Sequence, residues 1–183
     1  MNTIKLVGFT GSLRKGSYNR GALRAAKELL PEGAELEILD LSAIPFFNQD
    51  LEGGELPASV TEFKKKIAEA DALLIATPEY NYSIPPVLKN ALDWASRDPS
   101  RPLSGKPAAI FSVSSSALGG ARVQYHLRQV GVALNLKLVN QPEVFISFAR
   151  DKFDTDGNLK DEDTKKHLSA LVNALVDLAK AEK

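Results

Sequence analysis

The apolar run at residues 72–77, which ends directly before a loop rich in proline and tyrosine, constrains the fold of this chain most strongly. The run reads Ala-Leu-Leu-Ile-Ala-Thr. A strand with so few polar side chains is covered on both faces, which is typical of a parallel sheet. In open parallel sheets, ligands bind beyond the carboxyl ends of the strands. The loop that begins at Pro78 is therefore a candidate ligand-binding loop.

The composition of this loop suits a planar ligand. Residues 78–86 read Pro-Glu-Tyr-Asn-Tyr-Ser-Ile-Pro-Pro. Tyr80 and Tyr82 offer flat aromatic surface, and the prolines stiffen the backbone around them. We expect a helix to begin at Pro86, where a missing N–H group costs no helical hydrogen bond.

A second loop, at residues 11–19, has the donors that an anion requires. It follows an expected strand at 4–10 and reads Gly-Ser-Leu-Arg-Lys-Gly-Ser-Tyr-Asn. Ser12 and Ser17 offer hydroxyl donors, Arg14 offers a charged donor, and a helix beginning near Asn19 would direct backbone N–H groups to the same point. A terminal phosphate fits this loop. The glycine spacing matches neither the dinucleotide fingerprint nor the nucleoside triphosphate loop.

Strand and helix patterns alternate along the whole chain. The expected strands lie at 4–10, 35–40, 72–77, 108–114 and 136–140, with a second piece at 144–147. Apolar residues at helical spacing predict helices that include 19–30, 60–67, 86–97, 123–134 and 168–178. This alternation predicts an α/β, flavodoxin-like doubly wound three-layer sandwich with a five-stranded parallel sheet of order 2-1-3-4-5. In that order the ligand crevice lies between strands one and three, whose trailing loops are the two described above.

Length and composition limit the class of protein. The 183 residues fit one domain spanning 1–183, and the 23 Lys and Arg residues balance the 23 Asp and Glu residues. A balanced charge gives no attraction to nucleic acid or acidic membranes, so we expect small-molecule partners. The chain has no cysteine, so any redox chemistry must come from a bound cofactor. The apolar runs are too short to cross a bilayer and no signal peptide is evident, so we expect no membrane association and a cytoplasmic location.

Three polar features favour structural interpretations. The Asp-Thr-Asp-Gly-Asn stretch at 154–158 resembles a calcium loop, but Lys152 would occupy the first ligand position, so we favour a turn between Phe153 and Leu159. His126 and His167 lie on separate expected helices without metal-ligand spacing, and we predict no metal site. The serines at 114–116 lack the nucleophile elbow of hydrolases.

Taken together, the two loops resemble the NADPH-dependent FMN reductase family, particularly its bacterial quinone and chromate reductase branch. The family hallmarks Gly-Ser-Leu-Arg-x-x-Ser-x-Asn and Pro-Glu-Tyr-Asn-Tyr-Ser-x-Pro both stand in this chain. Residues 114–129 are similar to the third flavin-side loop of the family and the helix that follows it. The sequence departs at Pro86, where the family commonly has glycine.

The resemblance implies non-covalently bound FMN, with NADPH or NADH as co-substrate. It implies no catalytic side chain, because the flavin carries the chemistry. The cofactor-binding residues that it implies are Ser12, Leu13, Arg14, Ser17, Tyr18, Asn19, Pro78, Glu79, Tyr80, Asn81, Ser114, Ser115 and Gly119.

The activity implied is NAD(P)H-dependent reduction of quinones, flavins, azo compounds or chromate-type oxidised metals, by ping-pong hydride transfer through flavin N5. The alternative is a flavodoxin-like electron carrier without NAD(P)H oxidase activity of its own, which a stable one-electron-reduced flavin would reveal. The Glu79 carboxylate could act in acid–base chemistry, but the resemblance favours a role for its backbone along the ring. Whether Glu79 or Arg97 contacts the nicotinamide stays open at this point.

Family resemblance also implies an oligomer. We expect a homodimer formed around the loop of Tyr80 and Tyr82 and the helix of Trp94, where core packing of the indole is the alternative to a subunit contact. A homotetramer would use a polar face with Arg122, Tyr125 and Glu143, for which the alternative is simple solvation.

Overall fold

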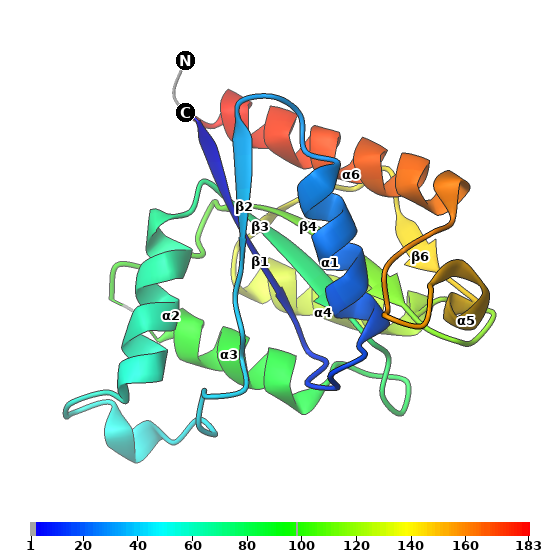
Figure 1. Ribbon diagram of the computed structural model, residues 1–183. Coiled ribbons are helices and arrows are strands. Elements are labelled where there is room, and N and C mark those ends of the chain that lie inside the picture. The colour runs from blue at the N-terminus through cyan, green and yellow to red at the C-terminus, as the bar shows by residue number, and fades with distance from the viewer. Residues whose placement is uncertain (1–2, 98) are drawn as a thin grey trace.

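The computed structural model describes residues 3–97 and 99–183. It contains a parallel sheet of order β2-β1-β3-β4-β5 with helices on both faces, which confirms the predicted topology (Figure 1). The strands are β1 (Ile4–Thr10), β2 (Ala34–Ile38), β3 (Ala72–Thr77), β4 (Pro107–Val113), β5 (Lys137–Leu138) and β6 (Val144–Ile146). The α-helices are α1 (Tyr18–Glu28), α2 (Ala58–Glu69), α3 (Pro86–Ser96), α4 (Ala121–Ala133), α5 (Ala149–Lys152) and α6 (Glu162–Ala181), and η1 (Gln49–Leu51) is a 3-10 helix.

The fifth position of the sheet is shared by two short strands. β5 pairs with the start of β4 through Lys137 and Leu138, and β6 pairs with its end through residues 144–146. The sheet of the described residues therefore has six strands in five positions, and β6 confirms the second piece predicted at 144–147. The short helix α5 follows β6 and was not predicted, because four residues carry no helical periodicity.

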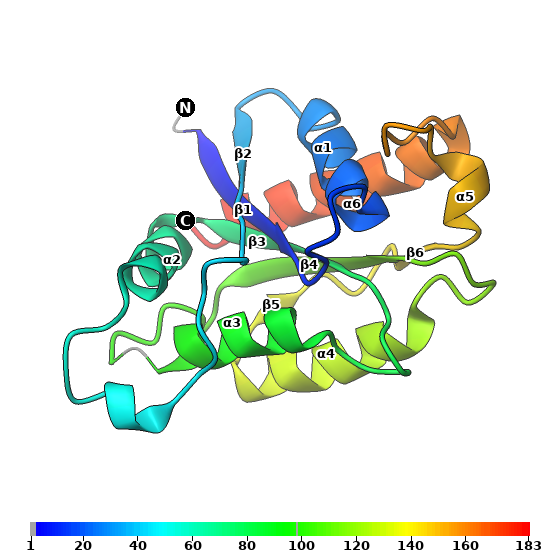
Figure 2. The ribbon, with the colours of Figure 1, turned by 60° about the horizontal axis from the view of Figure 1, so that its bottom comes forward.

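The sheet is buried on both faces, as the apolar run of β3 predicts. Figure 2 shows α1 and α6 on one side of the sheet and α3 and α4 on the other. Alternate residues of β3 divide between the two cores: Leu74 packs with α1 and α6, whereas Leu73 and Ile75 pack with α2 and α3. This covering leaves only the ends of the strands open to a ligand.

The carboxyl ends of the three central strands lie level with one another. Thr10 of β1 is paired with Ala76, and Thr77 of β3 is paired with Ser112. The loops at 11–17, 78–85 and 114–120 therefore leave the sheet side by side. The predicted crevice at the switch point is thus present in the fold.

Asn19 ties the first turn of α1 to the end of β4. Its side-chain Nδ2 donates to the Val113 carbonyl at 3.1 Å, and its Oδ1 accepts from the Val113 N–H at 3.1 Å. Both residues are buried. The helix that follows the phosphate-type loop is thereby fixed against the strand that precedes the serine-rich loop.

The turn at 154–158 is structural, as predicted. Phe153 and Leu159 form an antiparallel bridge across it. Oδ1 of Asp154 accepts hydrogen bonds from the N–H groups of Asp156 and Asn158 at 2.9 and 2.8 Å. Within the described part of the chain, no group of three or more His, Cys, Asp or Glu side chains is placed to hold a metal ion.

Trp94 belongs to the core, which confirms core packing of the indole over a subunit contact. Its side chain is 1% exposed, and its Nε1 donates to the Pro45 carbonyl at 2.9 Å. The Phe47 ring packs edge-on against the indole at 5.0 Å between centroids. The long loop before α2 is thereby pinned to α3 and covers the indole.

Candidate functional site

A pocket of ≈ 340 Å³ lies where the three loops leave the sheet. Its lining comes from the β1–α1 loop, the start of α1, the β3–α3 loop, the end of β4 and α5. The lining residues are Ser12, Arg14, Ser17, Tyr18, Asn19, Pro78, Glu79, Tyr80, Val113, Ser114, Ser115 and Arg150.

A larger groove of ≈ 770 Å³ follows the edge strand β2 and is a weaker candidate. It lies along the side of the sheet rather than at the carboxyl ends of the strands, where ligands of such sheets bind. Among its lining charges, Lys66 forms an ion pair with Glu37 at 2.9 Å. Location and chemistry therefore both favour the smaller pocket.

The first loop of the pocket is a tight turn that leads into α1. The Ser17 N–H donates to the Arg14 carbonyl at 3.1 Å, and the Ser17 hydroxyl caps α1 by accepting from the Arg20 N–H at 3.3 Å. Gly11 permits this path, because a Cβ there would lie 2.9 Å from side-chain carbons of Pro85 and Leu88. Backbone N–H groups at the start of α1 consequently face the pocket, as an anion site requires.

Aromatic packing also stabilises the side of the pocket that the β1–α1 loop forms. The Arg14 guanidinium lies 5.0 Å from the centroid of the Tyr18 ring, and this ring packs against Phe153 at 5.0 Å. The Tyr18 ring is thus a neighbour of the Arg14 guanidinium, and Arg14 lines the pocket.

The tyrosine loop is a hairpin with an unusual backbone. Tyr80 and Ser83 exchange N–H to carbonyl hydrogen bonds at 3.1 and 3.0 Å. The two residues between them, Asn81 and Tyr82, have φ values of 49° and 66°. Two consecutive left-handed residues are typical of a tight hairpin turn, and tyrosine adopts this region rarely. The turn leaves the Tyr80 ring 47% exposed and the Tyr82 ring 64% exposed.

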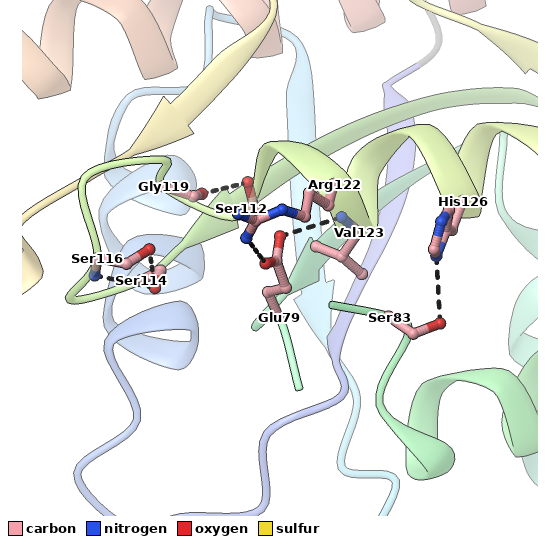
Figure 3. A network of polar contacts seen from close by, with 9 residues as sticks. All are labelled: Glu79, Ser83, Ser112, Ser114, Ser116, Gly119, Arg122, Val123 and His126. Atoms are coloured by element: carbon pink, nitrogen blue, oxygen red, sulfur yellow. Dashed lines mark hydrogen bonds and ion pairs between the residues drawn. The ribbon is translucent and has the colours of Figure 1, made fainter. Parts of the chain in front are cut away.

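Glu79 and Arg122 fasten this hairpin to α4 (Figure 3). The Glu79 carboxylate accepts from Nη1 of Arg122 at 2.9 Å and from the Val123 N–H at 3.2 Å, and its side chain is 9% exposed. The Arg122 guanidinium lies 3.8 Å from the centroid of the Tyr82 ring. We call Glu79, Arg122 and Tyr82 the hairpin clamp. Because the carboxylate is held by α4, it is the backbone of Glu79 that remains for a ligand.

A second contact fixes the far side of the hairpin. The Ser83 hydroxyl and Nδ1 of His126 lie 3.2 Å apart, as Figure 3 shows. His126 is exposed on α4 and contacts the hairpin.

The serine-rich loop is held by hydrogen bonds beneath it. The Ser112 hydroxyl donates to the Gly119 carbonyl at 2.6 Å and accepts from Nε2 of Gln124 at 2.8 Å. Ser114 and Ser116 join through their hydroxyls at 3.0 Å. Gly119, with φ of 57°, packs so closely that a Cβ would lie 2.8 Å from the Phe145 carbonyl carbon. This loop is therefore fixed in shape and presents Ser114 and Ser115 to the pocket.

Most of the predicted binding residues meet in this pocket, but three do not line it. Leu13 is exposed, Asn81 lies at the tip of the hairpin, and Gly119 is buried against β6. Arg97 also lies elsewhere, since it pairs with Glu52. Val113 and Arg150 line the pocket and were missed. Arg150 lies beyond the last strand of the sheet, so the rule that ligands meet strand ends would have pointed to its loop.

An α/β protein whose strand ends bring a donor-rich loop, an aromatic hairpin and a serine-rich loop to one pocket has the architecture of the flavodoxin-like class. The sequence model of the NADPH-dependent FMN reductase family matches residues 4–151, and the chain belongs to this family. Membership makes it an FMN-dependent oxidoreductase that takes electrons from NAD(P)H.

Relatives cover nearly the whole chain. An NAD(P)H-dependent FMN reductase of Pseudomonas aeruginosa is 50% identical, covering 94% of this chain and 93% of that protein. An NAD(P)H:quinone oxidoreductase of Solanum tuberosum is 52% identical, covering 96% and 93%. The solved structure of the flavoenzyme NAD(P)H:(acceptor) oxidoreductase FerB from Paracoccus denitrificans superposes with a TM-score of 0.88 at 33% identity, covering 98% of each chain.

The helices also bear on membrane association. Among residues 3–97 and 99–183, none of the helices combines the length and apolar character needed to cross a bilayer.

Proposed function

We propose that this protein reduces quinones with electrons from NAD(P)H. The nicotinamide and the quinone bind one after the other at its FMN. The observation that carries the proposal is the pocket in which a loop suited to an anion lies together with the exposed Tyr80. Relatives support the acceptor class: besides the potato protein, a quinone reductase of Escherichia coli K12 is 41% identical over 93% of both chains.

The charges and donors of the pocket fit FMN. Ser12 and Ser17 are buried hydroxyl-bearing residues next to the start of α1, and Arg14 adds a positive charge. Among the described lining residues, the only carboxylate is that of Glu79, which Arg122 neutralises. A phosphate therefore meets donors and positive charge without a competing free anion. We assign Ser12, Arg14, Ser17 and the first N–H groups of α1 to the flavin phosphate.

The other two loops would hold the ring. The backbone of residues 78–80, fixed by the hairpin clamp, lies on one side of the pocket, and Ser114 and Ser115 lie on another. We assign their hydroxyls to the ring edge that gains negative charge on reduction, where they would donate hydrogen bonds. When bound, FMN supplies the hydride chemistry, accepting from the nicotinamide at N5 and releasing two electrons to the acceptor.

The exposed rings of Tyr80 and Tyr82 favour flat acceptors. Aromatic faces at the mouth of the pocket stack on planar molecules, and quinones, free flavins and azo compounds share this shape. Chromate is not planar, so we propose it only as a substrate that the reduced flavin could reach.

Two measurements test the proposal. Flavin released by heat and separated by chromatography should be FMN, and initial rates with varied NAD(P)H and quinone should give the parallel lines of a ping-pong reaction. Recovery of FAD, or no flavin binding after reconstitution, would contradict the cofactor assignment. Absence of NAD(P)H oxidation with every quinone, in protein that holds FMN, would favour the electron-carrier alternative.

We also propose a homodimer that covers the exposed hairpin. Tyr80 and Tyr82 expose aromatic surface beside the pocket, and Phe46 is 79% exposed on the loop pinned to α3. Light scattering should give twice the monomer mass, and a fully active monomer would contradict the proposal.

If a tetramer forms through α4, we expect Tyr125 to provide most of the contact. Arg122 is already engaged with Glu79, and Glu143 lies 3.9 Å from Arg128. Tyr125 is 53% exposed. Tyr125→Ala should dissociate a tetramer into dimers, and an unchanged tetramer would exclude this face.

A further inference from the structure

Arg150 is a second arginine at the pocket, besides Arg14. It belongs to the short helix α5 and lines the same pocket as Arg14, Ser12 and Ser17. Its side chain is exposed to solvent. A bound anion at this pocket would therefore meet arginines from two separate segments of the chain.

Ion pairing separates these two arginines from four others in the protein. Arg20, Arg97, Arg122 and Arg128 each form an ion pair with a carboxylate. Neither Arg14 nor Arg150 has such a partner among residues 3–97 and 99–183. A guanidinium without a partner keeps its full positive charge for a ligand.

The backbone that carries Arg150 is tied to the serine-rich loop. The Phe148 N–H donates to the Ser116 carbonyl at 3.3 Å, and the Ala149 N–H donates to the Ser114 carbonyl at 3.1 Å. Phe148 itself has φ of 50°, so the chain turns sharply just before α5. These bonds tie α5 to the serine-rich loop, although α5 is only four residues long. At its other end, Phe153 packs against the Tyr18 ring at 5.0 Å, so α5 also adjoins the start of α1, where the phosphate is assigned.

We infer that Arg150 is a second phosphate-binding residue of the flavin pocket, which acts with Arg14 to favour FMN over unphosphorylated riboflavin. The inference rests on the proposed function, since it assumes that the pocket holds FMN. Guanidinium groups bind phosphate oxygens through paired N–H donors, and two such groups can neutralise a phosphate dianion. Riboflavin has the same ring but no phosphate, so it isolates this contribution.

The experiment is a flavin titration of the apoprotein, followed by quenching of flavin fluorescence. Arg150→Ala should weaken FMN binding about tenfold, the range of one charge-assisted hydrogen bond, and change riboflavin binding less than about twofold. Arg150→Lys keeps the charge but not the paired donors, and should give an intermediate loss. Lys152→Ala is the matched control, because it removes a positive charge from the same helix at a residue that does not line this pocket.

The outcomes separate this inference from the proposed function. Wild-type protein that binds no FMN would contradict the proposed function itself. Wild-type protein that binds FMN, with Arg150→Ala binding it equally well, would overturn the inference alone. An equal loss for FMN and riboflavin would also overturn it, because it would indicate a role in the shape of the pocket. A higher KM for NADPH but not NADH, with FMN affinity unchanged, would overturn it by assigning Arg150 to the phosphate of the donor.

Discussion

The two ends of the sheet differ in their charges, because the carboxyl end has the Glu79–Arg122 ion pair but also two arginines without a carboxylate partner among the described residues. At the amino end, Oδ2 of Asp71 accepts from the Lys5 N–H at 2.7 Å and pairs with Nζ of Lys183 at 2.9 Å, and Lys106 donates to the Ala70 carbonyl. At the carboxyl end, Arg14 and Arg150 line a pocket without a carboxylate partner among the described residues. Charges that are satisfied within the chain maintain the fold, whereas charges without partners are available for binding.

Backbone conformation does not separate the two ends. Asn81 and Tyr82 have positive φ beside the pocket, but so do Asn135 and Gly105 near the amino ends of β5 and β4. Left-handed residues occur wherever a tight turn is needed. Charge pairing, unlike backbone conformation, therefore differs between the pocket and the amino end of the sheet.

The largest effect should come from Asn19, which lines the pocket but serves the fold. Asn19→Leu leaves the buried N–H and carbonyl of Val113 without partners, and each such group costs about 1–3 kcal/mol. The free energy of unfolding of the apoprotein should fall by about 2–5 kcal/mol in urea titration. Asn173→Ala, an asparagine on α6 away from the pocket, is the control and should change it little. Equal losses for the two variants would show that the bonds to Val113 carry no special weight.

Arg14 should have the opposite role to Asn19: its replacement should lower FMN affinity and leave the stability of the apoprotein unchanged. Arg14→Ala removes a charge-assisted hydrogen bond to the proposed phosphate, so FMN affinity should fall ten- to a hundredfold, or about 1.5–3 kcal/mol. The apoprotein should unfold at the same urea concentration as wild type, because Arg14 forms no ion pair among the described residues. Lys15→Ala removes an exposed neighbouring charge that does not line the pocket, and should leave FMN affinity unchanged. Unchanged affinity in Arg14→Ala would mean that its side chain points to solvent.

The hairpin clamp lies between these extremes, because it stabilises the fold and shapes the pocket. Arg122→Ala leaves the nearly buried Glu79 carboxylate with only the Val123 N–H, and should cost about 1–2 kcal/mol of stability. Glu79→Gln keeps an acceptor and removes the charge that Arg122 neutralises. If the two residues act as a pair, the double variant should lose less than the sum of the single losses. Strict additivity would mean that the clamp does not act as a unit.

Local pattern was sufficient to predict the strands and the two main loops. The uniform apolar run of β3 predicted burial on both faces, and the donors at 12–17 predicted the wall that now lines the pocket. Each of these features depends on neighbouring residues and on the strand order. The sequence therefore predicted where the crevice lies.

The contacts between distant residues could not be predicted in this way. Glu79 and Arg122 are 43 positions apart, and Trp94 bonds to Pro45 at a separation of 49. Tertiary packing brings such partners together, and the local sequence does not specify which of many possible acceptors a donor will meet. Arg150 was missed for a related reason, since a four-residue helix after an interrupted strand has no periodic pattern to mark it.

Asp161 offers a charged group at the carboxyl end that serves the fold alone. It caps α6, where Oδ1 accepts from the Thr164 N–H at 2.9 Å and from the Thr164 hydroxyl. These bonds from the Thr164 side chain and backbone hold the pKa of Asp161 below its ordinary value of 3.8. Asp161→Ala should lower the free energy of unfolding by about 1 kcal/mol without changing FMN affinity.

The same cap gives a pH dependence with a definite sign. Because the pKa of Asp161 is lower in the folded protein, its contribution is fully present above pH 3.8 and is lost as the pH falls through the folded value. Wild type and Asp161→Ala should therefore differ in stability at neutral pH and converge in acid. A constant difference across this range would mean that the carboxylate does not cap the helix.

The smallest effect should come from Lys183 at the amino end of the sheet. Its ion pair with Asp71 is partly exposed, and such pairs contribute about 0.2–1 kcal/mol because solvent screens them. Burial acts to raise the pKa of Asp71, but the Lys5 N–H and Lys183 outweigh it, so this pKa also lies below 3.8. Lys183→Met should thus lower stability slightly at low ionic strength, and the difference should vanish in about 0.5 M salt or below the folded pKa of Asp71. FMN affinity should not change, since the paired charge lies at the opposite end of the sheet from the pocket. A measurable change in FMN affinity would contradict the assignment of the Lys183–Asp71 ion pair to the fold alone.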